Sequence, residues 1–364
     1  MSHCRKKQLS IFLNNKCNLG CRYCYDGANK SIEKKRETID MNFVKKGIAD
    51  YFANYTSREI RFFGNGEPTI ELDLIKKIVK FALSKDSEST FELQTSGYFS
   101  EDAVKWIGKN INIVWVSCDG FREIQNYYRP TINGDDSSAV VEKNIRYLAS
   151  LPITLGCRAT IGKKNIDKQI EIIDYFHSLG VKVVMSDPMF VAVDACNSSF
   201  SKEEAPNLIE YAKYFLKARR CAEKRGIFYG SILTVNFDEE TECACRACIP
   251  YPHLTIDGHV SACDMASDAL NEKMSALIYG KFDEIKNEIV YDQNAINIIK
   301  SRKAPNMTAC AKCEVLKNCA GGCLGEALNE TGSIFGVKPE TCKAIRYLAK
   351  KMPLNAGKYS YLHP

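Results

Sequence analysis

The sequence predicts an α/β protein in which parallel strands alternate with helices, followed by a cysteine-rich second unit. From residue 8 to residue 185, short runs of β-branched and aromatic residues alternate with amphipathic stretches, which is typical of parallel strands covered by helices. Beyond residue 241 the composition changes, because nine of the 17 cysteines lie between Cys243 and Cys342. The repeat itself is compatible with a barrel or with an open, doubly wound sheet.

Each element of the alternating part can be placed. We expect strands at 9–13, 59–63, 91–94, 111–116, 154–161 and 181–185, and helices at 42–53, 72–83, 101–108, 139–148 and 166–179. Residues 186–202 break the pattern and are interpreted as a linker, and a long helix is expected at 203–224. Functional side chains should gather where the parallel strands end, at their carboxyl edge.

Charge and hydropathy exclude several classes of partner. The 364 residues include 50 lysines and arginines against 44 aspartates and glutamates, without a long basic block, so we expect no nucleic-acid partner. No apolar stretch approaches the ~20 residues that cross a bilayer, so we expect no membrane partner. The apolar run at 9–13 is too short for a signal peptide. We therefore expect a cytoplasmic protein, whose cysteines bind metal rather than form disulfides.

Cys17, Cys21 and Cys24 form the most informative local pattern. They lie within eight residues, directly after the first expected strand. A four-iron cluster normally binds four thiolates, so a loop that offers three holds the cluster and leaves one iron open for an outside ligand. The alternative is a zinc loop, but none of the five histidines lies near these cysteines to complete a zinc site.

The spacing of these cysteines, three residues and then two, resembles the signature loop of the radical S-adenosylmethionine (radical SAM) superfamily. The resemblance implies that the open iron binds SAM and that one electron cleaves SAM to a 5′-deoxyadenosyl radical. It also implies the fold, a partial (β/α)6 TIM-like barrel with the cluster loop after the first strand. A flavodoxin or ferredoxin-type partner would donate the electron.

Three further segments carry the same resemblance. Gly64-Asn65-Gly66-Glu67-Pro68 resembles the Gly-Gly-Glu-Pro motif that binds the SAM amino group, with Asn65 in place of the first glycine. Gln94-Thr95-Ser96-Gly97 resembles the segment near the SAM ribose. Ser117-Cys118-Asp119-Gly120, with Arg129-Pro130 downstream, resembles an element of family members that carry a C-terminal cluster domain.

Arg158 is an additional candidate, because a guanidinium fork matches a carboxylate in two-point contact. A surface ion pair is the alternative for this residue. The SAM-contacting residues implied in this way are Gly66, Glu67, Thr95, Ser117 and Arg158.

The C-terminal cysteines resemble the seven-cysteine SPASM array of peptide-modifying radical SAM enzymes. Cys248, Gly258 and Cys263 are followed by Cys310-x2-Cys313-x5-Cys319-x3-Cys323 and by Cys342. The resemblance implies two auxiliary [4Fe-4S] clusters, and so three clusters in all. One would be held by Cys310, Cys313, Cys319 and Cys342. The other would be held by Cys248, Cys263 and Cys323, with Cys243 or Cys245 as the fourth ligand and a slight preference for Cys243.

Zinc knuckles would suit Cys310 to Cys319 but leave this longer pattern unexplained. The remaining cysteines have no such spacing and are interpreted as structural: Cys4, Cys118, Cys157, Cys196 and Cys221. The domains expected are a partial barrel at 1–200, a bridging helix and strand at 201–242, the SPASM domain at 243–342 and a tail at 343–364.

The resemblance covers nearly the whole chain and implies an oxidoreductase that modifies a peptide or protein, with a thioether or carbon–carbon crosslink as product. Only sixteen residues precede Cys17, so leader recognition would need a separate leader-binding protein or another surface. Asp264, directly after Cys263, stands where sulfatase-maturing relatives have their base, and a hydrogen-bonding role is the alternative. The other functions left open are an anaerobic sulfatase-type maturase, a small-molecule radical dehydrogenase and a multi-cluster electron carrier.

Overall fold

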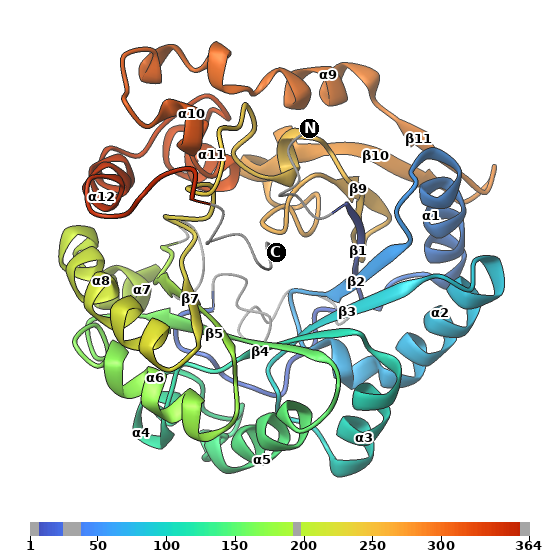
Figure 1. The fold of residues 1–364 in the computed structure, drawn as a ribbon. Coiled ribbons are helices and arrows are strands. Elements are labelled where there is room, and N and C mark those ends of the chain that lie inside the picture. Colours follow the sequence, from blue (N-terminus) through green and yellow to red (C-terminus); the bar gives the residue numbers. More distant parts are fainter. Residues whose placement is uncertain (1–6, 25–37, 192–197, 357–364) are drawn as a thin grey trace.

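Eleven strands form a single sheet in the part of the chain that the computed structural model describes, residues 7–24, 38–191 and 198–356 (Figure 1). The strand order is β11-β10-β9-β8-β1-β2-β3-β4-β5-β6-β7. Every neighbouring pair from β1 to β7 is parallel, which confirms the predicted α/β fold. These strands are β1 Gln8–Phe12, β2 Glu59–Phe63, β3 Thr90–Thr95, β4 Ile113–Ser117, β5 Thr154–Ile161, β6 Val183–Pro188 and β7 Phe228–Gly230.

Helices cover the outer face of the parallel strands, and the sheet curves into a partial barrel (Figure 1). Local capping sets where several helices begin. The Asp40 carboxylate, for example, accepts from the N–H groups of Asn42 and Phe43, each at 2.8 Å, and so starts α1. The helices are α1 Met41–Asn54, α2 Leu72–Lys85, α3 Glu101–Asn110, α4 Arg122–Tyr128, α5 Ser138–Ala149, α6 Gln169–Ser178, α7 Ser198–Glu204 and α8 Leu208–Lys224.

A continuous hydrophobic core lies between the strands and these helices. Trp115 on β4 is the largest of the fully buried side chains, and its neighbour in register on β5 is Gly156. A Cβ atom on Gly156 would come closer than 3.0 Å to the Trp115 ring. Val114 and Val116 belong to the core under the helices, so Trp115 lies on the opposite face of β4, and the glycine makes room for its indole there.

The cysteine-rich half continues the same sheet. β8 His253–Leu254 runs parallel to β1, with Ser10 beside His253 and Ile11 beside Leu254. β9 His259–Ser261, β10 Ile278–Asp283 and β11 Glu288–Tyr291 then follow as antiparallel neighbours. Val260, Leu277 and Leu328 belong to the same core as the barrel residues. The sheet and the core therefore both cross the boundary that the sequence places at residue 243. The remaining helices are α9 Gln293–Ser301, α10 Leu316–Cys319, α11 Leu324–Thr331 and α12 Pro339–Ala349.

Most expected elements lie within a few residues of the observed ones, and β2 and β5 have the expected bounds. The interpretation of 186–202 as a linker is wrong at both ends, because β6 extends to Pro188 and α7 begins at Ser198. The single helix expected at 203–224 is two helices. Pro206 interrupts it, and the Asn207 side chain caps the start of α8. The short helix α4 has no counterpart in the sequence prediction. Among the described residues, no helix is both long enough and apolar enough to cross a membrane.

Gly156→Ala tests the fit between β4 and β5. The added methyl group would overlap the Trp115 ring, so we expect the free energy of unfolding to fall by about 1–3 kcal/mol. Denaturant unfolding of the purified protein measures this loss. The control combines Gly156→Ala with Trp115→Leu, since the smaller side chain leaves room for the methyl group. The double variant should lose less than the sum of the single variants, and strict additivity would contradict the contact.

Candidate cluster and cofactor sites

The cysteine loop, residues 17–24, follows β1 and is braced by residues 128–132. The two segments run antiparallel, with backbone hydrogen bonds of 2.8 Å from Gly20 to Pro130 and 2.9 Å from Arg22 to Tyr128. The N–H of Ile132 returns a bond of 3.1 Å to the carbonyl of Asn18. The three thiols of this loop are half-buried. These backbone hydrogen bonds therefore hold the loop against residues 128–132.

A glycine brings the loop after β2 against the chain that leads into the cysteine loop. The N–H of Gly66 donates to the carbonyl of Asn14 at 3.2 Å, and the N–H of Glu67 donates to the carbonyl of Lys16 at 2.7 Å. A Cβ atom on Gly66 would lie closer than 3.0 Å to the Lys16 backbone and the Asn14 side chain. Only glycine permits this approach. The predicted SAM-binding segment and the cysteine loop are thus brought together.

The Glu67 carboxylate is buried and accepts four hydrogen bonds. One oxygen accepts from the N–H and hydroxyl of Thr69, at 3.1 and 2.6 Å, and from the Thr95 hydroxyl at 2.6 Å. The other oxygen accepts from the N–H of Ser96 at 2.6 Å. Each carboxylate oxygen offers about two acceptor sites, so the second oxygen keeps one site for a further donor. Glu67 therefore ties the end of β2 to the end of β3.

Ser117 and Arg158 lie side by side at the carboxyl edge, since Ser117 ends β4 and pairs in register with Arg158 on β5. The Arg158 guanidinium donates to the Asp187 carboxylate at 3.0 Å. An ion pair is the alternative role that the sequence suggests for Arg158. It uses one of the five N–H donors of a guanidinium, so the rest of the fork is left for other acceptors.

Several buried polar atoms around the cysteine loop have no hydrogen-bond partner among the described residues. They are the Asn18 amide oxygen within the loop, the Asn65 amide oxygen on the neighbouring β2 loop, and the Nε of Arg129 on the bracing segment. Buried polar atoms are rarely left unpaired, so this region suits a polar ligand. Three thiols and these unpaired groups fit an iron–sulfur cluster with a polar cofactor beside it.

The thiols of Cys17 and Cys21 are neutral near pH 7 when no metal is bound. Burial, together with the neighbouring Cys21, raises the pKa of Cys17 to about 12. Burial also raises the pKa of Cys21 to about 11, and the Arg129 guanidinium opposes that rise. Thiolates are the forms that bind iron, so metal binding would release these protons.

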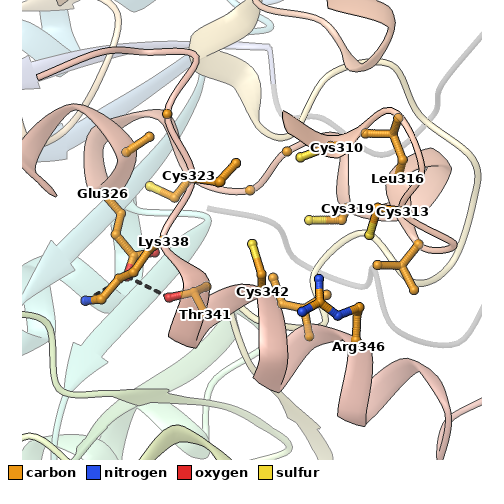
Figure 2. A pocket seen from close by; sticks show the side chains of 17 residues that line it. Cys310, Cys313, Leu316, Cys319, Cys323, Glu326, Lys338, Thr341, Cys342 and Arg346 are labelled. Atoms are coloured by element: carbon orange, nitrogen blue, oxygen red, sulfur yellow. Dashed lines mark hydrogen bonds and ion pairs between the residues drawn. The ribbon is translucent and has the colours of Figure 1, made fainter. Parts of the chain in front are cut away.

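A second group of cysteines lines a pocket of about 490 Å³ between α10 and α12. Figure 2 shows the sulfur atoms of Cys310, Cys313, Cys319 and Cys342 pointing toward a common space, while the sulfur of Cys323 points away from it. Burial raises the pKa of Cys319 to about 12, with further rises from Cys342, Cys310 and Cys313. The four thiols that the sequence assigns to one cluster are thus neighbours in space.

Cys323 belongs to another group. Burial raises its pKa to about 12, and Cys245 raises it further. The pKa of Cys263 is raised by both Cys323 and Cys245, and the Cys248 thiol has side-chain contacts with both Cys243 and Cys245. Gly325 allows α11 to approach the chain beside this group, because a Cβ atom there would lie closer than 3.0 Å to the Met265 sulfur and 3.3 Å from the Cys263 sulfur. Both candidate fourth ligands therefore adjoin this group, and the slight preference for Cys243 stays a prediction.

Among the described residues, no three His, Cys, Asp or Glu side chains converge closely enough to hold a single metal ion. A four-iron cluster does not require such convergence, because each thiolate bonds to a different iron. Cys118 and Cys157 are buried in the core. Cys221 lies on α8, where it accepts from the Arg225 guanidinium at 2.7 Å. The expected structural roles of Cys4 and Cys196 fall outside the described residues.

Asp264 lies at the end of the β9 segment within a buried cluster of basic groups. Its carboxylate forms ion pairs with Arg61, which is fully buried on β2, and with Arg246 at 3.2 Å. His253 Nε2 is 2.9 Å from the same carboxylate oxygen. Burial alone would raise the pKa of Asp264, but Arg61 and then Arg246 outweigh it and hold that pKa well below the ordinary value. The carboxylate therefore has a low affinity for protons.

Arg61, Arg246 and His253 are not among the functional residues predicted from the sequence. Arg61 had a recognisable signal, since it is a charged residue in the middle of the apolar strand Glu-Ile-Arg-Phe-Phe. Arg246 and His253 gave no such signal, because their partner Asp264 is brought to them only by the pairing of β8 with β1 and β9. Burial and the nearby Arg246 lower the pKa of His253 to about 4, so its ring is neutral near pH 7.

The comparison with known families agrees with the geometry of the cysteine loop. The model of the radical SAM superfamily matches residues 11–157, which contain the cysteine loop, the Gly66 loop and the strand ends described above. Over these residues the chain is similar to the radical SAM superfamily.

Similar proteins include relatives of different lengths. An uncharacterized protein of Methanocaldococcus jannaschii is 32% identical over 186 residues, which cover 50% of this chain and 62% of that protein. The radical SAM cyclopropyl synthase TigE of Paramaledivibacter caminithermalis is 21% identical over 371 residues, covering 95% of this chain and 74% of TigE. The chain thus spans less than two thirds of the first of these relatives.

Two solved structures share the fold over nearly the whole chain. The protein anSMEcpe with bound AdoMet has a TM-score of 0.76 at 16% identity, covering 94% of this chain and 92% of that protein. SuiB of Streptococcus suis bound to S-adenosylmethionine has a TM-score of 0.65 at 15% identity, covering 93% of this chain and 78% of SuiB. The chain therefore has the fold of these structures, with the partial barrel followed by a cysteine-rich C-terminal region.

Asp264→Asn tests the buried ion pairs. Removing the negative charge leaves Arg61 and Arg246 uncompensated, so we expect the free energy of unfolding at pH 7 to fall by about 2 kcal/mol. The figure is below that of fully buried pairs because a third of the Asp264 side chain is exposed. Unfolding midpoints at pH 7 measure the loss. Asp73→Asn, which breaks an exposed pair with Lys76, is the control and should leave the midpoint unchanged.

The pH dependence of the free energy of unfolding tests the same ion pairs of Asp264. The folded-state pKa of Asp264 is depressed, so its contribution to stability is present above the ordinary carboxyl pKa. The contribution is lost as the pH falls through the folded-state value. The gap between the wild-type protein and Asp264→Asn should therefore be constant above pH ~5 and narrow in acid. A gap that widens in acid would contradict the ion pairs.

Proposed function

We propose that this chain cleaves SAM reductively at a cluster held by Cys17, Cys21 and Cys24, and that it modifies a peptide or protein substrate by removing a hydrogen atom. The single observation that carries the proposal is the three-thiol loop, braced on both sides and surrounded by unpaired buried polar atoms. When bound, the cluster and SAM supply the 5′-deoxyadenosyl radical that abstracts hydrogen.

The roles of the chain's own residues follow from their contacts. Arg158 binds the SAM carboxylate with the donors that Asp187 leaves available. Thr95 ends β3 and Ser117 ends β4 on the same edge, and we assign both to contacts with the SAM nucleoside. The Glu67 carboxylate positions the loop through its four hydrogen bonds, and we assign the remaining acceptor site on its Oε2 to the ammonium group. The amide oxygen of Asn65, buried and without a partner among the described residues, is a second acceptor that we assign to that ammonium.

A peptide or protein is the proposed substrate because two structural relatives are known with peptides. The protein anSMEcpe has been solved with AdoMet and the Cp18Cys peptide, and SuiB with its precursor peptide SuiA. A thioether or carbon–carbon crosslink is the oxidation that we propose for this chain. A flavodoxin or ferredoxin-type protein would supply the electron.

Asp264 is better suited to hold Arg61 and Arg246 than to act as a base. An efficient general base has a pKa near the working pH, whereas Arg61 and Arg246 keep the pKa of Asp264 far below that range. The low pKa of Asp264 disfavours a sulfatase-type maturase in which this carboxylate takes the proton. We propose that Asp264 orients the two arginines inside the barrel.

We further propose two auxiliary clusters in the C-terminal half. The residues that would hold one are Cys310, Cys313, Cys319 and Cys342, and those that would hold the other are Cys245, Cys248, Cys263 and Cys323. The convergence of the first four sulfur atoms in Figure 2 supports the first set. Cys323 and Cys245 raise the pKa of Cys263, and Cys245 raises the pKa of Cys323, so these three thiols are close together, which supports the second set. Such clusters would accept the electron that the oxidised substrate releases.

Cys21→Ala tests the main proposal. The variant loses one of three ligands to the open cluster, so we expect 5′-deoxyadenosine formation from SAM and dithionite to fall below detection. We expect about eight irons per chain to remain, because the other two sites use different thiols. Anaerobic reconstitution, iron analysis and chromatography of the products measure both quantities. A wild-type protein that forms no 5′-deoxyadenosine would overturn the proposed function and favour an electron carrier.

Cys245→Ser and Cys243→Ser form a matched pair for the auxiliary site. Serine keeps the size of the side chain but is a poorer iron ligand than a thiolate. We expect Cys245→Ser to lose up to four irons per chain and Cys243→Ser to retain the wild-type content. Iron and sulfide analysis after identical reconstitution compares the two. The reverse order of iron loss would assign the ligand to Cys243.

A further inference from the structure

A buried guanidinium lies directly opposite Cys21. In the antiparallel pairing of the cysteine loop with residues 128–132, the bonded pairs Gly20 with Pro130 and Arg22 with Tyr128 flank the pair of Cys21 with Arg129. Only 9% of Arg129 is exposed. Its charge is therefore held at the base of the cysteine loop, out of reach of bulk solvent.

Two side chains fix this guanidinium in place. Nη1 of Arg129 donates to the Tyr23 hydroxyl at 2.8 Å, and that hydroxyl donates to the Asp119 carboxylate at 2.7 Å. The other oxygen of Asp119 accepts from the N–H of Thr160 at 2.8 Å, so the chain of contacts ends on β5. Tyr23 itself belongs to the cysteine loop, between Cys21 and Cys24. The contacts thus connect the loop, the bracing segment and the barrel.

The Arg129 guanidinium has a donor that the described residues leave without an acceptor. Its Nε is buried and has no hydrogen-bond partner in the part of the chain that the structure describes. Asp119 is fully buried, and burial raises its pKa while Arg129 opposes that rise. Burial likewise raises the pKa of Cys21, and among the neighbouring groups Arg129 counteracts the rise most strongly. A fixed positive charge in a low-dielectric region favours negative charge at the cysteine loop.

We propose that Arg129 is a positioning residue that raises the reduction potential of the cluster held by Cys17, Cys21 and Cys24. The inference rests on the proposed function, since it requires that cluster. In the step concerned, one electron passes from the reduced donor protein to the cluster, the donor is oxidised by one electron, and no bond forms or breaks. The cluster site becomes more negative by one charge, and the Arg129 guanidinium stabilises that added charge. Net charge and contacts to the sulfurs are among the factors that set such potentials.

Arg129→Gln and Arg22→Gln form the matched test. Both remove one positive charge next to Cys21, but Arg129 is buried, whereas Arg22 is exposed and lies over the Tyr127 ring. The reconstituted full-length protein is titrated anaerobically and followed by EPR. Only the part of the signal that changes on adding SAM is used, because SAM binds the cluster with the open iron. For Arg129→Gln we expect the equilibrium constant for reduction to fall at least tenfold, which is about 59 mV for one electron. For Arg22→Gln we expect a change of less than twofold, since water and salt screen an exposed charge.

Asp119→Asn keeps the test decisive if Arg129→Gln fails to retain its cluster. This substitution removes a buried negative charge from the same chain of contacts, so we expect the equilibrium constant for reduction to rise. Equal midpoints for the wild-type protein and Arg129→Gln, at equal iron content, would overturn the inference. A lowered midpoint for Asp119→Asn would also overturn it. A wild-type protein without any SAM-dependent EPR signal would instead overturn the proposed function, so the two failures are distinguishable.

Discussion

Backbone hydrogen bonds between three loops are the constraint on which the candidate site depends. The cysteine loop pairs with residues 128–132 on one side, and the chain just before it bonds to the Gly66 loop on the other. All three loops meet at the carboxyl edge of the parallel strands, where barrels of this type place their functional residues. Because the contacts are between backbones, they fix the positions of the three thiols without using any of them.

Buried arginines are a second feature of the structure. Arg129 lies beneath the cysteine loop, and Arg61 with Arg246 surrounds Asp264 inside the barrel. Buried arginines are costly unless paired, so their presence near two groups of thiols is informative. Iron–sulfur clusters with thiolate ligands carry net negative charge, which such arginines would balance. The formal charge of +6 for the chain without cofactors is understandable in the same way.

The two halves of the chain share one sheet and one hydrophobic core at the centre of the molecule. β8 continues the barrel sheet alongside β1, and the hydrophobic core is shared. This pairing carries His253 and, through β9, Asp264 to the inner side of β2, where Arg61 lies. The cysteine-rich half therefore contacts the interior of the barrel directly, through the ion pairs of Asp264 with Arg61 and Arg246.

The sequence by itself determined the α/β repeat, the bounds of β2 and β5, and the spacing of the cysteines, because hydrophobic periodicity and ligand spacing are local properties. It also carried the local signals for the break in the helix expected at 203–224, Pro206 and the capping residue Asn207, which that prediction missed. It could not determine that Glu67 accepts from Thr69, Thr95 and Ser96, since these contacts depend on how the strand ends come together. Only the tertiary structure decided that Cys245 lies with Cys263 and Cys323, that Arg129 faces Cys21, and that Asp264 is held by two arginines. Each of these pairs joins residues 18 to 203 positions apart or depends on the register of a loop, and sequence spacing carries no information about such contacts.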